Sequence, residues 1–167
     1  LTIHGQWLYK ALLTAPSLSH AGVADWRPRR LAALTAGTTA RDIEAAGAEL
    51  AASRFVVIDD DAEEVLIRTF IRWDGLMKKP NMAVAMAKAW SGIASKALRG
   101  VVVHELHRLL EDQPDLHGWG HPNSKAKVQE VLDQERVDAA TLTAWTPDWW
   151  ADAAASAAAS SALRAAM

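Results

Sequence analysis

Two runs of β-branched and aromatic residues, separated by a short acidic segment, restrict the fold of this chain more than any other feature. The first run is Phe55-Val56-Val57-Ile58, and the second extends from Val65 to Trp73 (VLIRTFIRW). Such runs are typical of β-strands, and the polar segment Asp59 to Glu64 (DDDAEE) favours a turn between them. We therefore predict a β-hairpin. In its second strand, alternation of side chains places Arg68 and Arg72 on the same face.

Helical patterns precede this hairpin. Apolar residues at helical spacing and punctuation by proline and glycine predict helices over 5–13, 28–36 and 39–53, with a brief strand within 20–25. Pro28 suits the first turn of the second helix, and Gly37 suits its close. Thr38 or Thr39 is expected to cap the third helix, with Asp42 placed to complete a capping box.

The predicted order is helix, strand, helix, turn, helix and hairpin, which is the order of a winged helix. We therefore expect a mainly α fold with a small β-hairpin: a winged helix-turn-helix domain over 1–76, a helical extension over 77–140, and a Trp-containing, Ala-rich tail over 141–167. In the extension we expect a helix starting at Pro80 that Gly92 and Ser95 break or kink, then one long or two short helices up to Pro114. A loop over 118–123 and a helix over 124–137 complete it, and the tail is expected to be helical or frayed.

Charge is distributed unevenly along the chain although the formal net charge is only −2. Residues 36–66 carry eight acidic and two basic side chains, whereas residues 67–108 carry eight basic and two acidic ones. The first stretch repels phosphate and the second can attract it. A further basic cluster, Arg27, Arg29 and Arg30, surrounds Pro28.

Several segments resemble the winged-helix DNA-binding proteins of actinobacterial phages and prophages, described as helix-turn-helix or replication-initiation-like proteins. These segments are GQWLYKALL, HAGV, RRLAALTAGTT and above all EEVLIRTFIRWDGLMKKPN, within residues 1–110. The resemblance implies a protein that binds double-stranded DNA in phage replication initiation or transcriptional regulation and has no catalytic residues. It also places the protein in the cytoplasm of a bacterial host cell.

In this interpretation the third helix lies in the major groove, while the basic strand and the helix after it contact phosphates. The expected DNA-binding residues are Arg29, Arg30, Thr38, Thr39, Arg41, Ala45, Arg68, Arg72, Lys78, Lys79 and Lys88. The expected partners are duplex DNA and either a second copy of the chain or a replication partner protein, with no membrane.

Two other interpretations remain open. The acidic turn Asp59-Asp60-Asp61 lies where winged helices carry basic residues, and Arg41 is the one arginine in the third helix placed to contact guanine. These features favour a protein-interaction module of a replication complex. An excisionase-like factor that bends its DNA site has the same fold. Whether the basic residues lie on one surface distinguishes DNA binding from protein interaction.

Catalysis and metal binding receive little support from the sequence. The chain has no cysteine, which excludes disulfides and thiolate chemistry. His104 and His107 lack the spacing of a metalloprotease helix, so we interpret them, with His117 and His121, as polar edges and expect Glu105 to be solvated. We expect no enzyme activity, metal or cofactor. Because Leu1 opens directly into a helical pattern, we also expect residues upstream of it.

The eight tryptophans are numerous for 167 residues. Trp7 and Trp73 are expected in the core, and Trp90 in either the core or an interface. Trp145, Trp149 and Trp150 cluster in the tail among acidic residues, which disfavours base stacking. We therefore expect them to form an intermolecular contact.

Overall fold

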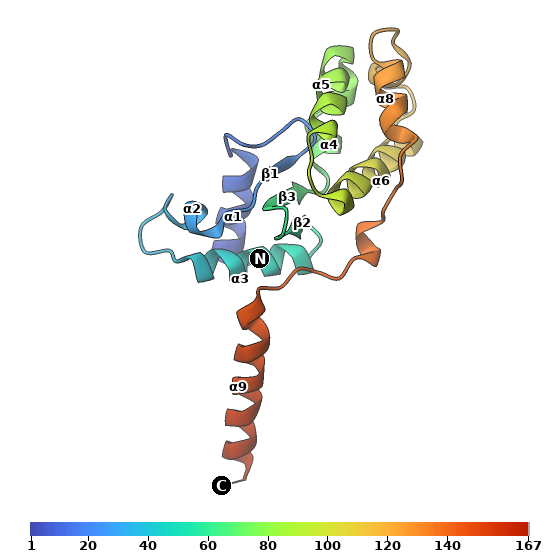
Figure 1. Ribbon diagram of the computed structural model, residues 1–167. Helices are drawn as coiled ribbons and strands as arrows, with labels where there is room; N and C mark the ends of the chain where they lie inside the picture. Colours follow the sequence, from blue (N-terminus) through green and yellow to red (C-terminus); the bar gives the residue numbers. More distant parts are fainter. Residues whose placement is uncertain (167) are drawn as a thin grey trace.

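The computed structural model describes residues 1–166 as a mainly helical chain with one small three-stranded antiparallel sheet (Figure 1). In chain order the elements are α1 (Ile3–Leu13), β1 (Val23–Asp25), α2 (Pro28–Ala32), α3 (Ala40–Ala52), β2 (Val56–Asp59), β3 (Glu64–Ile67), α4 (Phe70–Trp73), η1 (Leu76–Lys78), α5 (Pro80–Ser91), α6 (Lys96–Asp112), α7 (His117–Gly120), α8 (Lys125–Leu132), η2 (Ala139–Thr141) and α9 (Asp148–Ala165).

The sheet lies between two layers of helices. Its strand order is β1-β3-β2, and the central strand β3 pairs Leu66 with Val23 on one side and with Val57 on the other. Val65 and Ile67 belong to a core cluster with α1, α2 and α3, whereas Leu66 belongs to a second cluster with α4 to α8. Because neighbouring residues of a strand point to opposite faces, β3 is apolar on both of its faces.

The first core cluster is centred on Trp26, which is 1% exposed. Helix α3 packs its buried stripe of Ile43, Ala46 and Leu50 into this cluster. Gly47 lies directly against the Trp26 ring, and a Cβ there would collide with Trp26 and approach the Ile58 side chain to 3.3 Å. A glycine at this position therefore allows α3 to pack closely against the indole.

The second cluster confirms the predicted break between helices α5 and α6. Gly92 ends α5, and the Ser95 hydroxyl accepts a hydrogen bond from the Leu98 N–H at 3.1 Å to begin α6. From there Leu98, Val102 and Leu106 are buried along α6 against α4, α5 and α8. Of the two alternatives for this segment, the structure has one long helix, α6 (Lys96–Asp112).

The second predicted strand is wrong beyond Ile67. The strand ends there because both neighbours run out: Ile67 pairs with Val56, where β2 begins, and its N–H donates to the carbonyl oxygen of Gly22, which precedes β1. One further bond, from the Arg68 N–H to the Phe55 carbonyl oxygen at 3.1 Å, closes the pairing with the residue before β2. The chain then turns into α4, whose Ile71 is buried. Trp73 is 79% exposed, so its expected place in the core is also wrong. The alternation that placed Arg68 and Arg72 on one face of a strand does not exist.

Three other predicted boundaries differ from the structure. Helix α2 ends at Ala32 instead of Ala36, since the following residues form only turn bonds and Leu34 is 68% exposed. The expected loop over 118–123 begins within α7, where Gly118 packs so closely that a Cβ would lie 2.7 Å from the Met77 carbonyl oxygen. Helix α8 ends at Leu132 instead of 137, where its buried stripe ends.

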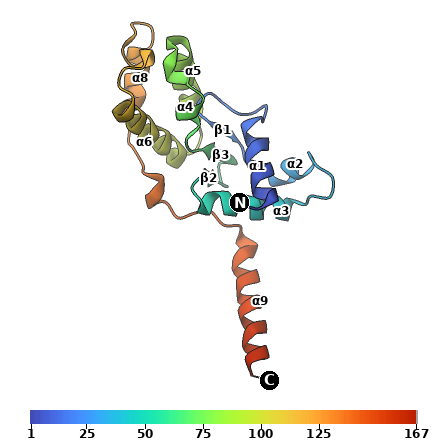
Figure 2. The ribbon, with the colours of Figure 1, turned by 180° about the vertical axis from the view of Figure 1, so that it is seen from behind.

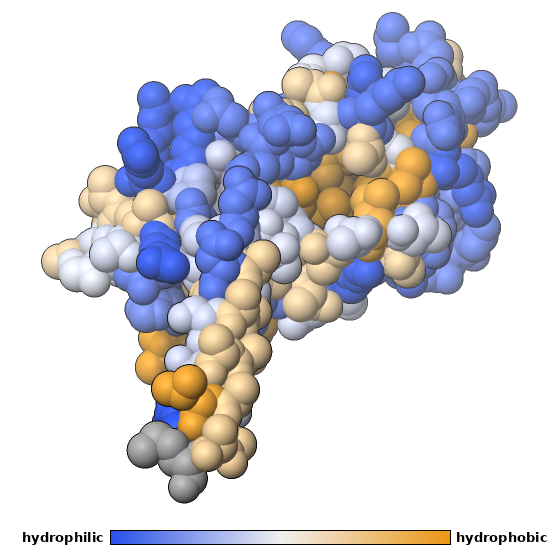
Figure 3. All heavy atoms as spheres, turned by 60° about the horizontal axis from the view of Figure 1, so that its bottom comes forward, coloured by the Kyte–Doolittle hydropathy of each residue, from blue (hydrophilic) through white to orange (hydrophobic). Residues whose placement is uncertain are grey.

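Helix α9 projects away from the body, and none of its residues is buried (Figures 1 and 2). Seen along this projection, its surface is mostly the pale hydrophobic tint of alanine (Figure 3). Of the two states expected for the tail, helical or frayed, the structure shows a helix from Asp148 to Ala165. No helix within residues 1–166 has both the length and the apolar character needed to cross a membrane.

Candidate nucleic-acid interface

The first turn of α3 is fixed by the capping box that its sequence predicts. Thr39 is the cap: its hydroxyl accepts from the Asp42 N–H at 3.2 Å, and the Asp42 carboxylate accepts from the Thr39 N–H at 2.8 Å. The hydrogen bonds from Thr39 lower the pKa of the Asp42 carboxyl. This cap sets the direction of the first turn, from which Arg41 extends at the exposed surface. Thr38 and Ala45 are half-buried on either side of it.

Helix α2 presents a second exposed basic group. Arg29 and Arg30 lie on its solvent side, and within the described residues neither forms an ion pair. Arg27, just before the helix, is instead paired with Glu63 at 3.3 Å. Since α2 packs against α3, the free arginines and Arg41 belong to the same helical layer.

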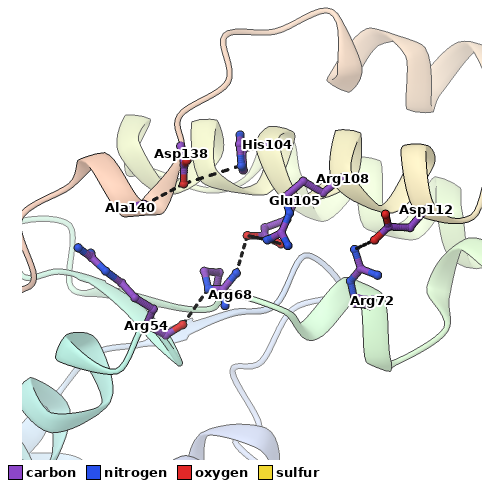
Figure 4. A network of polar contacts seen from close by, with 9 residues as sticks. All are labelled: Arg54, Arg68, Arg72, His104, Glu105, Arg108, Asp112, Asp138 and Ala140. Atoms are coloured by element: carbon purple, nitrogen blue, oxygen red, sulfur yellow. Dashed lines mark hydrogen bonds and ion pairs between the residues drawn. The ribbon is translucent and has the colours of Figure 1, made fainter.

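Arg68 and Arg72 turn inward toward α6 rather than outward toward a ligand (Figure 4). The Arg68 guanidinium donates to Glu105 Oε1 at 2.8 Å and to the Arg54 carbonyl oxygen at 2.8 Å. Arg72 donates to the Asp112 carboxylate at 2.7 Å. Both arginines therefore join the β3–α4 segment to α6, and the structure gives them a structural role in place of free contacts.

Glu105 is buried, at 6% exposed, so the expectation that it is solvated is wrong. Besides Arg68, it accepts from Arg108 one turn along α6, at 3.3 Å. A buried carboxylate remains charged only when a positive group pairs with it. Arg68, which follows β3, therefore faces α6 and pairs with Glu105. Arg68 lies 37 positions away, so the residues around Glu105 in the sequence do not identify this partner.

His104 and His107 each contact a different part of the chain that follows α6. His104 lies 3.8 Å from Asp138, whose pKa is lowered mainly by the hydrogen bond from the Ala140 N–H, and His107 Nε2 lies 2.9 Å from the Leu132 carbonyl oxygen. In residues 1–166 no group of three or more histidine, aspartate or glutamate side chains is placed to bind a metal ion.

The acidic turn has an internal function that its sequence does not reveal. Glu64 accepts from the N–H groups of Ala94 and Ser95 at 3.0 and 2.9 Å, and Asp59 accepts from the Ser95 hydroxyl at 2.5 Å. These carboxylates therefore lie at the N-terminus of α6, where the helix dipole favours negative charge. Asp60 and Asp61 stay exposed at the tip of the turn.

Lys78, Lys79 and Lys88 are exposed and form no ion pair within the described part of the chain. Lys78 lies in η1, Lys79 immediately precedes α5, and Lys88 lies near the end of α5. Helix α2 lies at one end of the body and α5 with α8 at the other (Figures 1 and 2). The free basic residues therefore form two groups rather than one continuous surface. The single surface expected for DNA binding is not present among the described residues, and only the group on α2 lies beside α3.

The tail tryptophans pack on the chain's own α3 layer, so their expected intermolecular contact is wrong for Trp145 and Trp149. Trp145 meets Trp26 edge to face at 5.3 Å between ring centroids. The Trp149 indole N–H donates to Glu44 Oε2 at 2.6 Å, and the Arg41 guanidinium lies 4.3 Å from the Trp149 ring centroid. We call residues 142–150, which carry these side chains, the strap.

Comparison with known proteins gives no relative from which to take a site. The chain matches no family model, no curated protein and no solved structure. The function must therefore be argued from the geometry described above.

Proposed function

We propose that this protein binds duplex DNA through a winged helix formed by residues 3–67. The observation that carries the proposal is the order α1-β1-α2-α3-β2-β3 together with a sheet in which β3 lies between β1 and β2. In such a domain the second helix of the helix-turn-helix pair enters the major groove with its N-terminal residues at the base edges. Here that helix is α3, and the residues are Thr39 and Arg41.

The contacts to phosphate come from basic side chains that no other part of the described chain neutralises. Arg29 and Arg30 on α2 are exposed beside α3 and are the nearest such pair in the fold. Lys78 and Lys79 form a separate exposed pair. Phosphate contacts hold a protein on the duplex without reading sequence, which suits flexible surface side chains.

The resemblance to winged-helix proteins of actinobacterial phages and prophages supports a role in replication initiation or transcriptional regulation. The resembling segments overlap α1, α2 and β3 and reach the start of β1, which are four of the six elements of the proposed DNA-binding domain; α3 and β2 lie outside them.

A protein-interaction module is the second candidate, and a groove between α1 and α2 favours it. This groove has a volume of about 680 Å³ and an apolar floor that includes Trp7, Ala11 and Leu31. Lys10 and Arg30 lie along it. A groove of this composition suits an amphipathic partner segment with acidic residues.

The salt dependence of duplex binding tests the proposal. We expect the affinity of the full chain for a labelled duplex to fall steeply with salt, and Arg29→Ala/Arg30→Ala to flatten the logarithmic slope by about two units because each lost phosphate contact removes roughly 0.9. The matched control is Lys125→Ala/Lys127→Ala, which removes two exposed positive charges from α8. Equal slopes for the two variants would contradict the proposed surface.

The second basic pair is measured in the same way. If Lys78 and Lys79 also contact phosphate, replacing both with alanine weakens binding to all duplexes alike and flattens the slope by up to about two units. Unchanged affinity would restrict the DNA surface to the α2–α3 layer. No salt-dependent binding by any of these proteins would favour the interaction module.

A further inference from the structure

The strap is held on the α3 layer by four separate contacts, each to a different residue of that layer. At its start, Arg54 donates to the Leu142 carbonyl oxygen at 2.9 Å. In its middle, Trp145 packs against Trp26. At its end, Trp149 contacts both Arg41 and Glu44. Because these contacts occur along the whole strap, it is docked on the body rather than only crossing its surface.

The last two contacts fall on the part of α3 to which the proposed function assigns base contact. Arg41 and Glu44 lie in the first turns of the helix, and Trp149 engages both side chains. While its guanidinium stacks on the Trp149 indole, the Arg41 side chain is held at the strap and must leave that position to reach a guanine edge in the major groove. The strap and a duplex therefore need the same side chain.

The strap and the residues on either side of it are negatively charged, as phosphate is. From residue 137 to residue 163 all charged side chains are acidic, and Asp148 lies at the junction of the strap with α9. Desolvation, and then the charges of Glu44, Asp148 and Asp61, raise the pKa of Asp60, so docking brings the Asp148 carboxylate among those of α3 and the acidic turn. Repulsion within this group limits how tightly the strap is held.

We propose that the strap is an intramolecular competitor that occupies the DNA-reading surface of α3 and must leave before that surface can bind bases. This inference rests on the proposed function. Helix α9, which has no buried residue, continues directly from the strap and leaves with it. Release also lifts Leu142 and Trp145 from the outside of the two core clusters, and the loss of this packing is the cost of release. The apparent affinity for DNA is then the intrinsic affinity multiplied by the fraction of molecules whose strap is released.

The coupling is reciprocal. If strap release raises the affinity for DNA by some factor, bound DNA shifts the equilibrium between docked and released strap by the same factor. The two effects give independent measurements. Affinity reports the first, and protease access to the strap reports the second.

The test compares Trp149→Ala with the matched control Trp73→Ala, whose indole is 79% exposed on α4. Binding is measured by fluorescence anisotropy with a labelled duplex of about 30 base pairs at low salt. We expect Trp149→Ala to bind roughly tenfold more tightly than the natural chain, and Trp73→Ala to bind equally to it. Trp149→Phe, which keeps a ring over Arg41 and loses the N–H, is expected to lie between them.

Chymotrypsin cleavage after Trp145 measures strap release in the natural chain, and saturating duplex is expected to accelerate it. Equal affinities of the natural chain and Trp149→Ala, or cleavage that saturating duplex leaves unchanged, would overturn the strap inference and leave DNA binding in place. If no chain binds the duplex although Trp149→Ala is cleaved faster at Trp145, the proposed function fails and the competition fails with it.

Discussion

Removing the Arg68 guanidinium should destabilise the protein far more than it affects any ligand. Glu105 is only 6% exposed. In Arg68→Ala its carboxylate keeps a single partner, Arg108, which lies 3.3 Å away and has a side chain that is 48% exposed. Breaking a buried ion pair from one side costs about 3–5 kcal/mol. Because the Arg68 side chain is itself 24% exposed, water can partly replace it, and we expect a loss near 3 kcal/mol.

A double-mutant cycle separates the pair energy from the loss of packing. Glu105→Gln keeps the side-chain volume and leaves Arg68 partly solvated, so we expect a smaller loss of about 1–2 kcal/mol. The cycle closes with Arg68→Ala/Glu105→Gln, which removes both charges and is expected to lose about 2 kcal/mol, less than the sum of the two single losses, because no buried charge is left unpaired. The expected coupling energy is therefore about 2 kcal/mol or more.

Urea unfolding at neutral pH measures these free energies, with an unchanged slope showing that the same surface is exposed in each case. A domain of this size has a total stability of about 5–15 kcal/mol, so each variant remains folded in water. Arg68→Ala within about 0.5 kcal/mol of the natural chain would refute the structural role of the pair. It would also return Arg68 to the residues available for DNA.

Three further outcomes are expected. Gly47→Ala forces a methyl group against Trp26 and should lower the stability by about 1–3 kcal/mol in the same urea assay; an unchanged midpoint would contradict the close packing. Partial desolvation, and then the charges of Glu44, Asp148 and Asp61, raise the pKa of the exposed Asp60 above its ordinary 3.8. The native state therefore binds this proton more readily, and stability falls as pH rises through the raised pKa; Asp60→Asn should lessen this fall, and identical pH profiles would argue against it. Arg41→Ala should cost roughly 1–3 kcal/mol at a preferred site and little on other duplexes, whereas equal losses on all sequences would make Arg41 a phosphate contact.

Local patterns predicted the elements whose ends are determined within a few residues. The capping box of Thr39 and Asp42 and the break between Gly92 and Ser95 need only neighbouring residues, and both appear as expected. The run from Val65 to Trp73 was misread because its composition suits a strand throughout. Its end depends on where two partner strands begin, and those lie far away in sequence.

The candidate site was harder to predict because its determining contacts are distant in the chain. The Arg68–Glu105 bond joins residues 37 positions apart, and the Trp149–Glu44 bond joins residues 105 positions apart. Charge type was readable in the sequence, but whether a charge is free depends on these partners. The sequence does not show that Arg68 has a buried partner while Arg29 and Arg30 have no ion-pair partner in the described residues.

The placement of charge suggests how two modes of DNA binding would divide among the elements. The free basic residues on α2 lie outside the strap contacts, so phosphate binding through them is open to the chain with its strap docked. Base contact through Arg41 requires release of the strap, because Trp149 holds the Arg41 side chain in the docked form. Since phosphate contact carries no sequence information, the docked form would hold duplex DNA without preference and the released form would read it. Sequence preference in this chain would therefore depend on a tail that makes no base contact itself.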